Sequence, residues 1–149
     1  MGLSEDALYV LETVLERRLP PAYRRYLADR NGDDGIDCDF DFRDVPNGRD
    51  NTTILHYLYG LRPGQSGHDL WKANLYLRPN LPDGMIGIGG DALGNTLVLS
   101  LTGPTYGRVS YLDLDALHLP GDPAPGFSPL ASDFDAFLAL LDGPLPPRE

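Results

Sequence analysis

The strongest constraint on the fold is the segment 85–114, MIGIGGDALGNTLVLSLTGPTYGRVSYLDL, which holds three short runs rich in apolar residues. The runs cover residues 85–89, 96–102 and 108–113, and Gly-containing turns at residues 90–95 and 103–107 separate them. Apolar and polar residues that alternate with a period of two are typical of strands with one buried face. We therefore expect three antiparallel strands joined by tight turns.

Helix signals and strand signals both occur along the rest of the chain. Ser4 is expected to cap a first helix, Pro21 to begin a second, and Ser132 to cap the last. The expected helices cover residues 4–17, 21–30, 69–77 and the segment between Ser132 and Gly143; the expected strands cover residues 36–42 and 52–59; residues 119–129 are expected to be irregular. The length favours a single domain over residues 1–149.

The charge balance restricts the class of partner. Asp and Glu number 22 against 12 Lys and Arg, so the formal net charge is -10 at pH 7. Such a surface repels nucleic-acid phosphates and anionic membranes, and it attracts basic proteins. We therefore expect a protein partner, no nucleic acid and no membrane.

Three features predict a cytoplasmic protein. The single Cys38 cannot form an internal disulfide, which fits a reducing compartment. No apolar stretch approaches the roughly 20 residues needed to cross a bilayer. The first residues, MGLSEDALYV, lack the basic region that begins a secretory signal.

Two apparent ligand-binding motifs lack the context that they need. Residues 87–92, GIGGDA, match a dinucleotide-binding pattern, but that pattern requires a helix to begin there, and the next residues have strand periodicity. Residues 29–40 begin like a calcium loop, but Asp34 stands at its Gly position and Phe40 at its bidentate Glu position. We expect no cofactor and no metal site.

Carboxylates alternate with apolar residues in the predicted strand 36–42, and two more precede it. On spacing alone these carboxylates suit a divalent metal, acid–base chemistry, a surface for a basic partner, or a solvated face of an edge strand. We adopt the partner surface as the hypothesis. The residues assigned to it are Asp33, Asp34, Asp37, Asp39 and Asp41.

No side chain shows the pattern of a nucleophile or a general base. His56, His68 and His118 are far apart in the sequence, and none stands at a metal-ligand spacing from Cys or Glu. Cys38 lies on the apolar side of its predicted strand, which favours a buried, inert thiol. We therefore predict no catalytic residue and no enzymatic activity.

An ordered set of short motifs resembles the SUKH superfamily, whose members carry Smi/Knr-type domains. The residues that carry the resemblance are Leu19-Pro20, Tyr23, Tyr26-Leu27, Asn31-Gly32, Ile86-Gly87-Ile88-Gly89, Asp91, Gly94-Asn95, Gly107-Arg108-Val109, Asp113, Phe134, Phe137 and Leu138. They cover nearly the whole chain in order, although residues 44–78 carry no matching signature.

The resemblance implies an α+β fold, with a mixed, mostly antiparallel sheet and helices packed against it, in a single Smi/Knr-like domain. It also implies a protein-binding role. It implies a bacterial immunity protein that neutralises a toxin, often a nuclease, by stoichiometric binding. Fungal relatives imply an alternative, a regulatory or scaffolding module that binds a host protein, such as one in the regulation of cell-wall synthesis. The resemblance transfers no catalytic residue and no contact residue to this chain.

Overall fold

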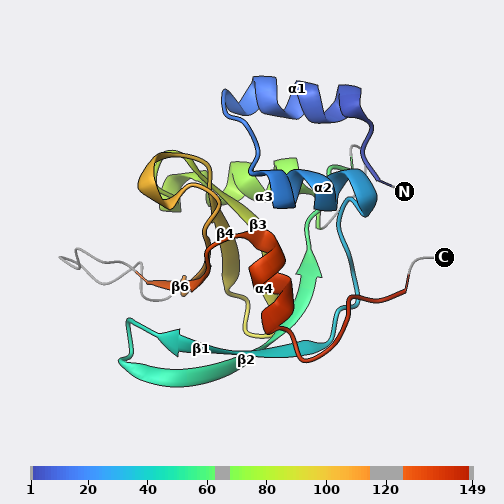
Figure 1. Ribbon diagram of the computed structural model, residues 1–149. Coiled ribbons are helices and arrows are strands. Elements are labelled where there is room, and N and C mark those ends of the chain that lie inside the picture. The colour runs from blue at the N-terminus through green and yellow to red at the C-terminus, as the bar shows by residue number, and fades with distance from the viewer. Residues whose placement is uncertain (1, 63–67, 115–125, 148–149) are drawn as a thin grey trace.

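The computed structural model describes residues 2–62, 68–114 and 126–147, and its strands form one six-stranded sheet in the order β1 to β6 (Figure 1). The strands are β1 (Cys38–Asp44), β2 (Arg49–Leu58), β3 (Met85–Asp91), β4 (Thr96–Ser100), β5 (Val109–Leu112) and β6 (Phe127–Ala131). The helices are α1 (Glu5–Leu15), α2 (Pro21–Asp29), α3 (Leu70–Leu77) and α4 (Phe134–Leu140), with short 3-10 turns at Arg78–Asn80 and Gly103–Thr105. The α+β class is confirmed, and each named strand pairs with its sequence neighbour in antiparallel register.

The predicted meander is present as β3, β4 and β5. The expectation that these strands bury only one face is wrong, because every residue of β4 and β5 is buried and both faces of the sheet are therefore covered there. The turn between β3 and β4 is held by the Asp91 carboxylate, which accepts hydrogen bonds from the backbone N–H groups of Leu93 and Asn95 at 3.0 and 2.9 Å. Gly94 has φ +82, a conformation that side chains with a Cβ rarely adopt. The GIGGDA motif lies within β3 and this turn, so no helix begins there to hold a pyrophosphate.

The first two helices begin as predicted, but the last helix is capped by a different residue. Ser4 Oγ accepts a hydrogen bond from the Ala7 N–H at 3.1 Å, and Pro21 is the first residue of α2. The prediction that Ser132 caps α4 is wrong, because Asp133 accepts the bond from the Ala136 N–H at 2.8 Å. Since α4 begins at Phe134, only the residue directly before it can reach that amide.

The expectation of irregular structure near residue 129 is also wrong. Phe127–Ala131 form β6, while residues 119–125 lie outside the described residues. Pro129 was a reason to expect no strand. However, β6 is the last strand of the sheet, and proline is tolerated at an edge because no further strand needs its N–H.

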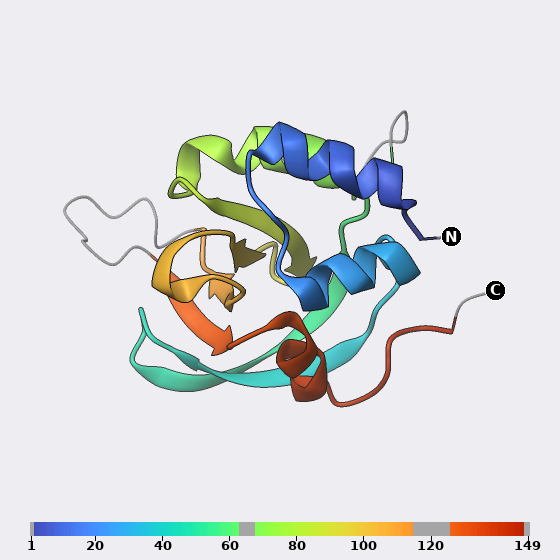
Figure 2. The same ribbon diagram turned by 45° about the horizontal axis from the view of Figure 1, so that its top comes forward.

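The core is aromatic where the helices meet the sheet. Tyr23 of α2 lies edge-on to Phe134 of α4 with ring centroids 5.3 Å apart, and Phe40 of β1 lies edge-on to Phe137 at 5.5 Å. The sheet curves so that its first and last strands approach each other, since the Val45 N–H donates to Ser128 Oγ at 3.0 Å. Figures 1 and 2 place the β1–β2 hairpin and α1 at opposite ends of the molecule.

Candidate protein-binding surface

Strand β1 alternates strictly between buried and exposed side chains. Its buried positions are Cys38, Phe40, Phe42 and Asp44, and the exposed positions around them are Asp37, Asp39, Asp41 and Arg43. The predicted alternation is therefore confirmed. Side chains of successive strand residues point to opposite faces, so three aspartates share the solvent side of this strand.

Strand β2 adds to the same solvent side through its register with β1. Thr52 lies opposite Asp41 and donates its hydroxyl to that carboxylate at 2.6 Å, and Asp50 lies opposite Arg43 and pairs with it at 3.3 Å. We call the outward residues of the hairpin the acidic face; its members are Asp37, Asp39, Asp41, Arg43, Asp50 and Thr52. The carboxylates outnumber the guanidinium, so the face carries net negative charge.

The segment after α4 lies along part of the free edge of β1 and brings a further carboxylate there. The Asp39 N–H donates to Asp142 Oδ1, and the Asp142 N–H donates to the Asp39 carbonyl, both at 2.9 Å. Cys38 Sγ lies 3.6 Å from the Gly143 carbonyl oxygen, and burial raises the pKa of this thiol. The sequence reasoning missed Asp142 because a contact over about 100 residues leaves no local signal. The expectation of a buried Cys38 is confirmed.

Asp33 is separated from the acidic face because its side chain is buried, with an exposed fraction of 3%. The backbones of Asp33 and Leu58 exchange two hydrogen bonds, at 3.0 and 2.8 Å. The Asp33 carboxylate accepts from the Tyr26 hydroxyl at 2.7 Å and forms an ion pair with Arg30 at 2.6 Å. Asp33 thus links the end of α2 to the sheet, and we leave it out of the proposed binding surface.

Asp34 belongs to a different polar cluster. It pairs with Arg62 at 2.7 Å and with His68 Nδ1 at 2.5 Å, and the His68 ring stacks on Tyr57 with centroids 3.8 Å apart. Burial alone would raise the pKa of Asp34, but the hydrogen bonds from Arg62 and His68 outweigh it and lower that pKa. These contacts engage Asp34 within the chain, so it too is left out of the proposed surface.

Two further buried carboxylates have structural partners. Asp44 accepts from the side-chain amides of Asn47 and Asn51 at 2.9 and 3.1 Å, which fixes the turn of the β1–β2 hairpin. Asp91 accepts from the hydroxyls of Thr53 and Tyr111 in addition to its two turn amides. Both carboxylates are therefore engaged in holding turns and strands together. In the described part of the chain, which leaves out His118, no three His, Cys, Asp or Glu side chains are grouped to hold a metal ion.

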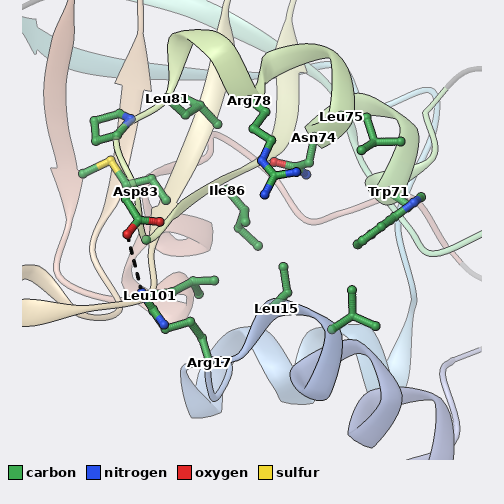
Figure 3. A pocket seen from close by; sticks show the side chains of 14 residues that line it. Leu15, Arg17, Trp71, Asn74, Leu75, Arg78, Leu81, Asp83, Ile86 and Leu101 are labelled. Carbon is green, nitrogen blue, oxygen red and sulfur yellow. Dashed lines mark ion pairs between the residues drawn. The ribbon is translucent and has the colours of Figure 1, made fainter.

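A groove between α1 and α3 has a volume of about 380 Å³ (Figure 3). Trp71 lies at one end, and the ion pair between Arg17 and Asp83, 3.9 Å long, lies at the other. The walls are mainly apolar and come from Val14, Leu15, Leu75, Leu81, Met85, Ile86 and Leu101. The Arg78 guanidinium points into the groove between them.

One side chain of α3 joins this helix to β3 beside the groove. Strand β2 pairs with β3 only from Gly89 to Asp91, so the earlier part of β3 has no strand on that side. Asn74 of α3 takes that place: its Oδ1 accepts from the Gly87 N–H at 2.7 Å, and its Nδ2 donates to the Gly87 carbonyl at 2.9 Å. An added Cβ at Gly87 would lie 2.5 Å from Leu77 Cδ1, so α3 packs closely here.

Sequence reasoning did not find the groove, although a signal was available. In the predicted helix 69–77, Leu70, Ala73 and Leu77 form the inward stripe, yet Trp71 and Leu75 are large apolar residues outside it. Their spacing of four places them together on one side of the helix. Apolar residues off the buried stripe indicate a second contact surface.

No described helix is both long enough and apolar enough to span a membrane.

Comparisons with known proteins identify the family. None of the curated proteins compared with the chain matches it. The family model described as SMI1 / KNR4 family (SUKH-1) matches residues 2–140, nearly the whole chain. The chain is therefore a member of the SMI1/KNR4 family, SUKH-1.

Proposed function

We propose that this protein is a cytoplasmic immunity protein that binds a basic, nuclease-type toxin domain and blocks it by stoichiometric occlusion. Family membership supports a protein-binding role, and the acidic face supports a basic partner. The proposed mechanism needs no catalytic residue, cofactor or metal. The observation on which it depends most is that Asp37, Asp39 and Asp41 share one exposed side of β1.

Binding through this face follows from its charge and its accessibility. A nuclease active site is built to attract phosphates, so its rim is basic and complements a row of carboxylates. The net charge of -10 would steer such a toxin toward the protein and raise the association rate. The same charge keeps the protein away from nucleic acid, so it would compete with the substrate only for the toxin.

The partner is best identified by affinity capture from the source organism, with this protein as bait at low and then high salt. We expect a basic protein with a C-terminal toxin domain that is released by salt. Recovery of a protein of cell-wall synthesis or its regulation would instead favour the regulatory module. Protection of cells against the co-expressed toxin then tests immunity directly.

The surface is tested by reversing its charge. Asp37, Asp39 and Asp41 are each changed to Lys, and association with the captured toxin is followed by stopped flow at several salt concentrations. We expect the association rate at low salt to fall about tenfold or more and its salt dependence to weaken, because local steering is lost.

A matched control separates the acidic face from net charge. The triple variant Asp6→Lys, Glu16→Lys and Asp83→Lys makes the same change in net charge at exposed positions on or beside α1. We expect this control to slow association much less. Equal slowing by both triples would show that only net charge matters, and no slowing by the first would overturn the surface assignment.

A further inference from the structure

The groove between α1 and α3 combines exposed apolar side chains with positive charge. Val14, Trp71 and Leu75 line it with exposed fractions of 52, 41 and 53%. Val10, one turn before Val14 on α1, is also largely exposed. Apolar side chains gathered at a hollow mark an interaction site more often than single scattered ones do. This surface is the second candidate site, and it does not depend on the proposed function.

The groove carries more positive than negative charge although the protein is strongly acidic, because Arg17 and Arg78 line it together with Asp83. The Arg78 guanidinium projects into the groove and has no hydrogen bond or ion pair with any residue that the structure describes. Arg17 pairs with Asp83 at 3.9 Å and donates one Nη–H to the Glu16 carbonyl at 3.1 Å, while its Nε is buried with no acceptor among the described residues. Two guanidinium groups therefore have unused donors beside an apolar wall, and a carboxylate is the group that satisfies them best.

The shape favours a segment of a protein over a small molecule. A drug-sized ligand is commonly buried over 70–90% of its surface in a closed pocket. This groove is partly open to solvent between two helices, and the exposed Val10 lies one turn before Val14 on α1. An apolar segment laid in a groove between helices is a common mode of peptide recognition.

We propose that the groove between α1 and α3 binds a segment of a partner protein in which an Asp or Glu neighbours bulky apolar side chains. The apolar side chains pack on Trp71, Leu75 and Val14, and the carboxylate pairs with Arg78. This acidic segment is opposite in charge to the basic partner that we expect at the acidic face. Since the two surfaces lie at opposite ends of the molecule, both can be occupied at once (Figure 2).

The probe for this proposal is a library of random 12-residue peptides displayed on phage. It is selected on the whole protein, with counter-selection on the Arg78→Glu variant. We expect enrichment of peptides that carry Asp or Glu within a few residues of Trp, Phe, Leu or Ile. No enrichment, or enrichment of basic peptides, would overturn the proposal.

The enriched peptides are then titrated against the protein while tryptophan fluorescence is recorded. Trp71 is the only tryptophan of the chain and lines the groove, so its emission reports occupancy there, provided that the peptides titrated contain no Trp. We expect Arg78→Glu to weaken binding at least tenfold and the matched surface change Arg108→Glu to leave it unaltered. A peptide whose acid is replaced by Lys should regain binding to the Arg78→Glu variant.

Two results would overturn the proposal at this stage. One is equal affinity of the selected peptides for the wild type and the Arg78→Glu variant. The other is binding without any change in Trp71 emission. Circular dichroism of each variant confirms that it is folded before its affinity is compared.

Discussion

Removal of the Asp91 carboxylate is expected to cause one of the largest losses of stability that a single polar substitution can produce in this protein. Asp91 is 4% exposed and accepts hydrogen bonds at 2.7 Å from Thr53, 2.5 Å from Tyr111, 3.0 Å from Leu93 and 2.9 Å from Asn95. The first two donors are hydroxyls within the sheet, and the last two are amides of the turn. Asp91→Ala leaves all four without this acceptor.

The expected loss of stability in Asp91→Ala depends on how many of these four donors can be hydrated in the variant. The turn amides lie beside the exposed Leu93 and can be solvated, whereas the hydroxyls of Thr53 and Tyr111 lie deeper. A hydrogen bond to a charged group contributes about 1.5–3 kcal/mol, so losing two without compensation costs roughly 4 kcal/mol. That is a large part of the roughly 5–15 kcal/mol by which a domain is stable.

Asp91→Asn provides the graded comparison. The amide oxygen can still accept from the two turn amides, but its NH₂ group faces the Tyr111 hydroxyl, which already accepts from Asn95 Nδ2 at 2.8 Å. We expect a cost of about 2 kcal/mol, intermediate between the wild type and Asp91→Ala. The free energy of unfolding is measured by urea denaturation. The exposed change Asp41→Ala, expected to cost about 0.5 kcal/mol or less, is the control.

The reasoning would be refuted by two results. One is a cost below about 1.5 kcal/mol for Asp91→Ala, which is less than one charged hydrogen bond contributes. The other is an equal cost for the Ala and Asn variants, since only the Asn variant keeps an acceptor for the turn. Either result would show that the backbone conformation of the turn, and not the hydrogen bonds of the Asp91 carboxylate, stabilises it.

Two further predictions concern stability at low pH and packing beneath β3. Burial alone would raise the pKa of Asp44, but hydrogen bonds from Asn47 and Asn51 outweigh it and lower that pKa. The Asp44 carboxylate therefore contributes its full share of the free energy of unfolding above about pH 4, and this share is lost as the pH falls through the lowered pKa. Between pH 6 and 3, Asp44→Asn should lose less stability than the wild type in urea titrations. An equal loss would contradict this prediction. At Gly89 an added Cβ would lie 2.5 Å from the Tyr57 carbonyl oxygen, so Gly89→Ala should destabilise by about 2 kcal/mol or more in the same assay, and a cost near zero would show that β2 can move aside.

The elements that could be predicted from the sequence are those specified by short-range signals. Alternation at residues 96–102 and the turn at Gly94 define a hairpin without reference to any distant residue. The Ser4 cap and the proline at the start of α2 act within one helical turn. The cap of α4 was misplaced by one residue because Ser132 and Asp133 are both good caps, and only the packing of Phe134 decides between them.

The candidate site was predictable only in part, for a related reason. Periodicity alone predicts that Asp37, Asp39 and Asp41 are exposed, since their neighbours in β1 are apolar. Periodicity does not predict that Asp33 turns inward, because its bonds to Tyr26 and Leu58 depend on how α2 meets the sheet. Asp142 and the groove likewise result from segments that are distant in the sequence.

The strict alternation of β1 allows one strand to serve two independent requirements. Its inward positions, such as Phe40 and Phe42, carry the packing and leave no room for change. Its outward positions lie in solvent, where substitutions usually alter stability by no more than about 0.5 kcal/mol. The side chains that face solvent can therefore be exchanged, residue by residue, while the fold is preserved. Such a strand can change the charge that it presents to solvent without compensating changes in the core.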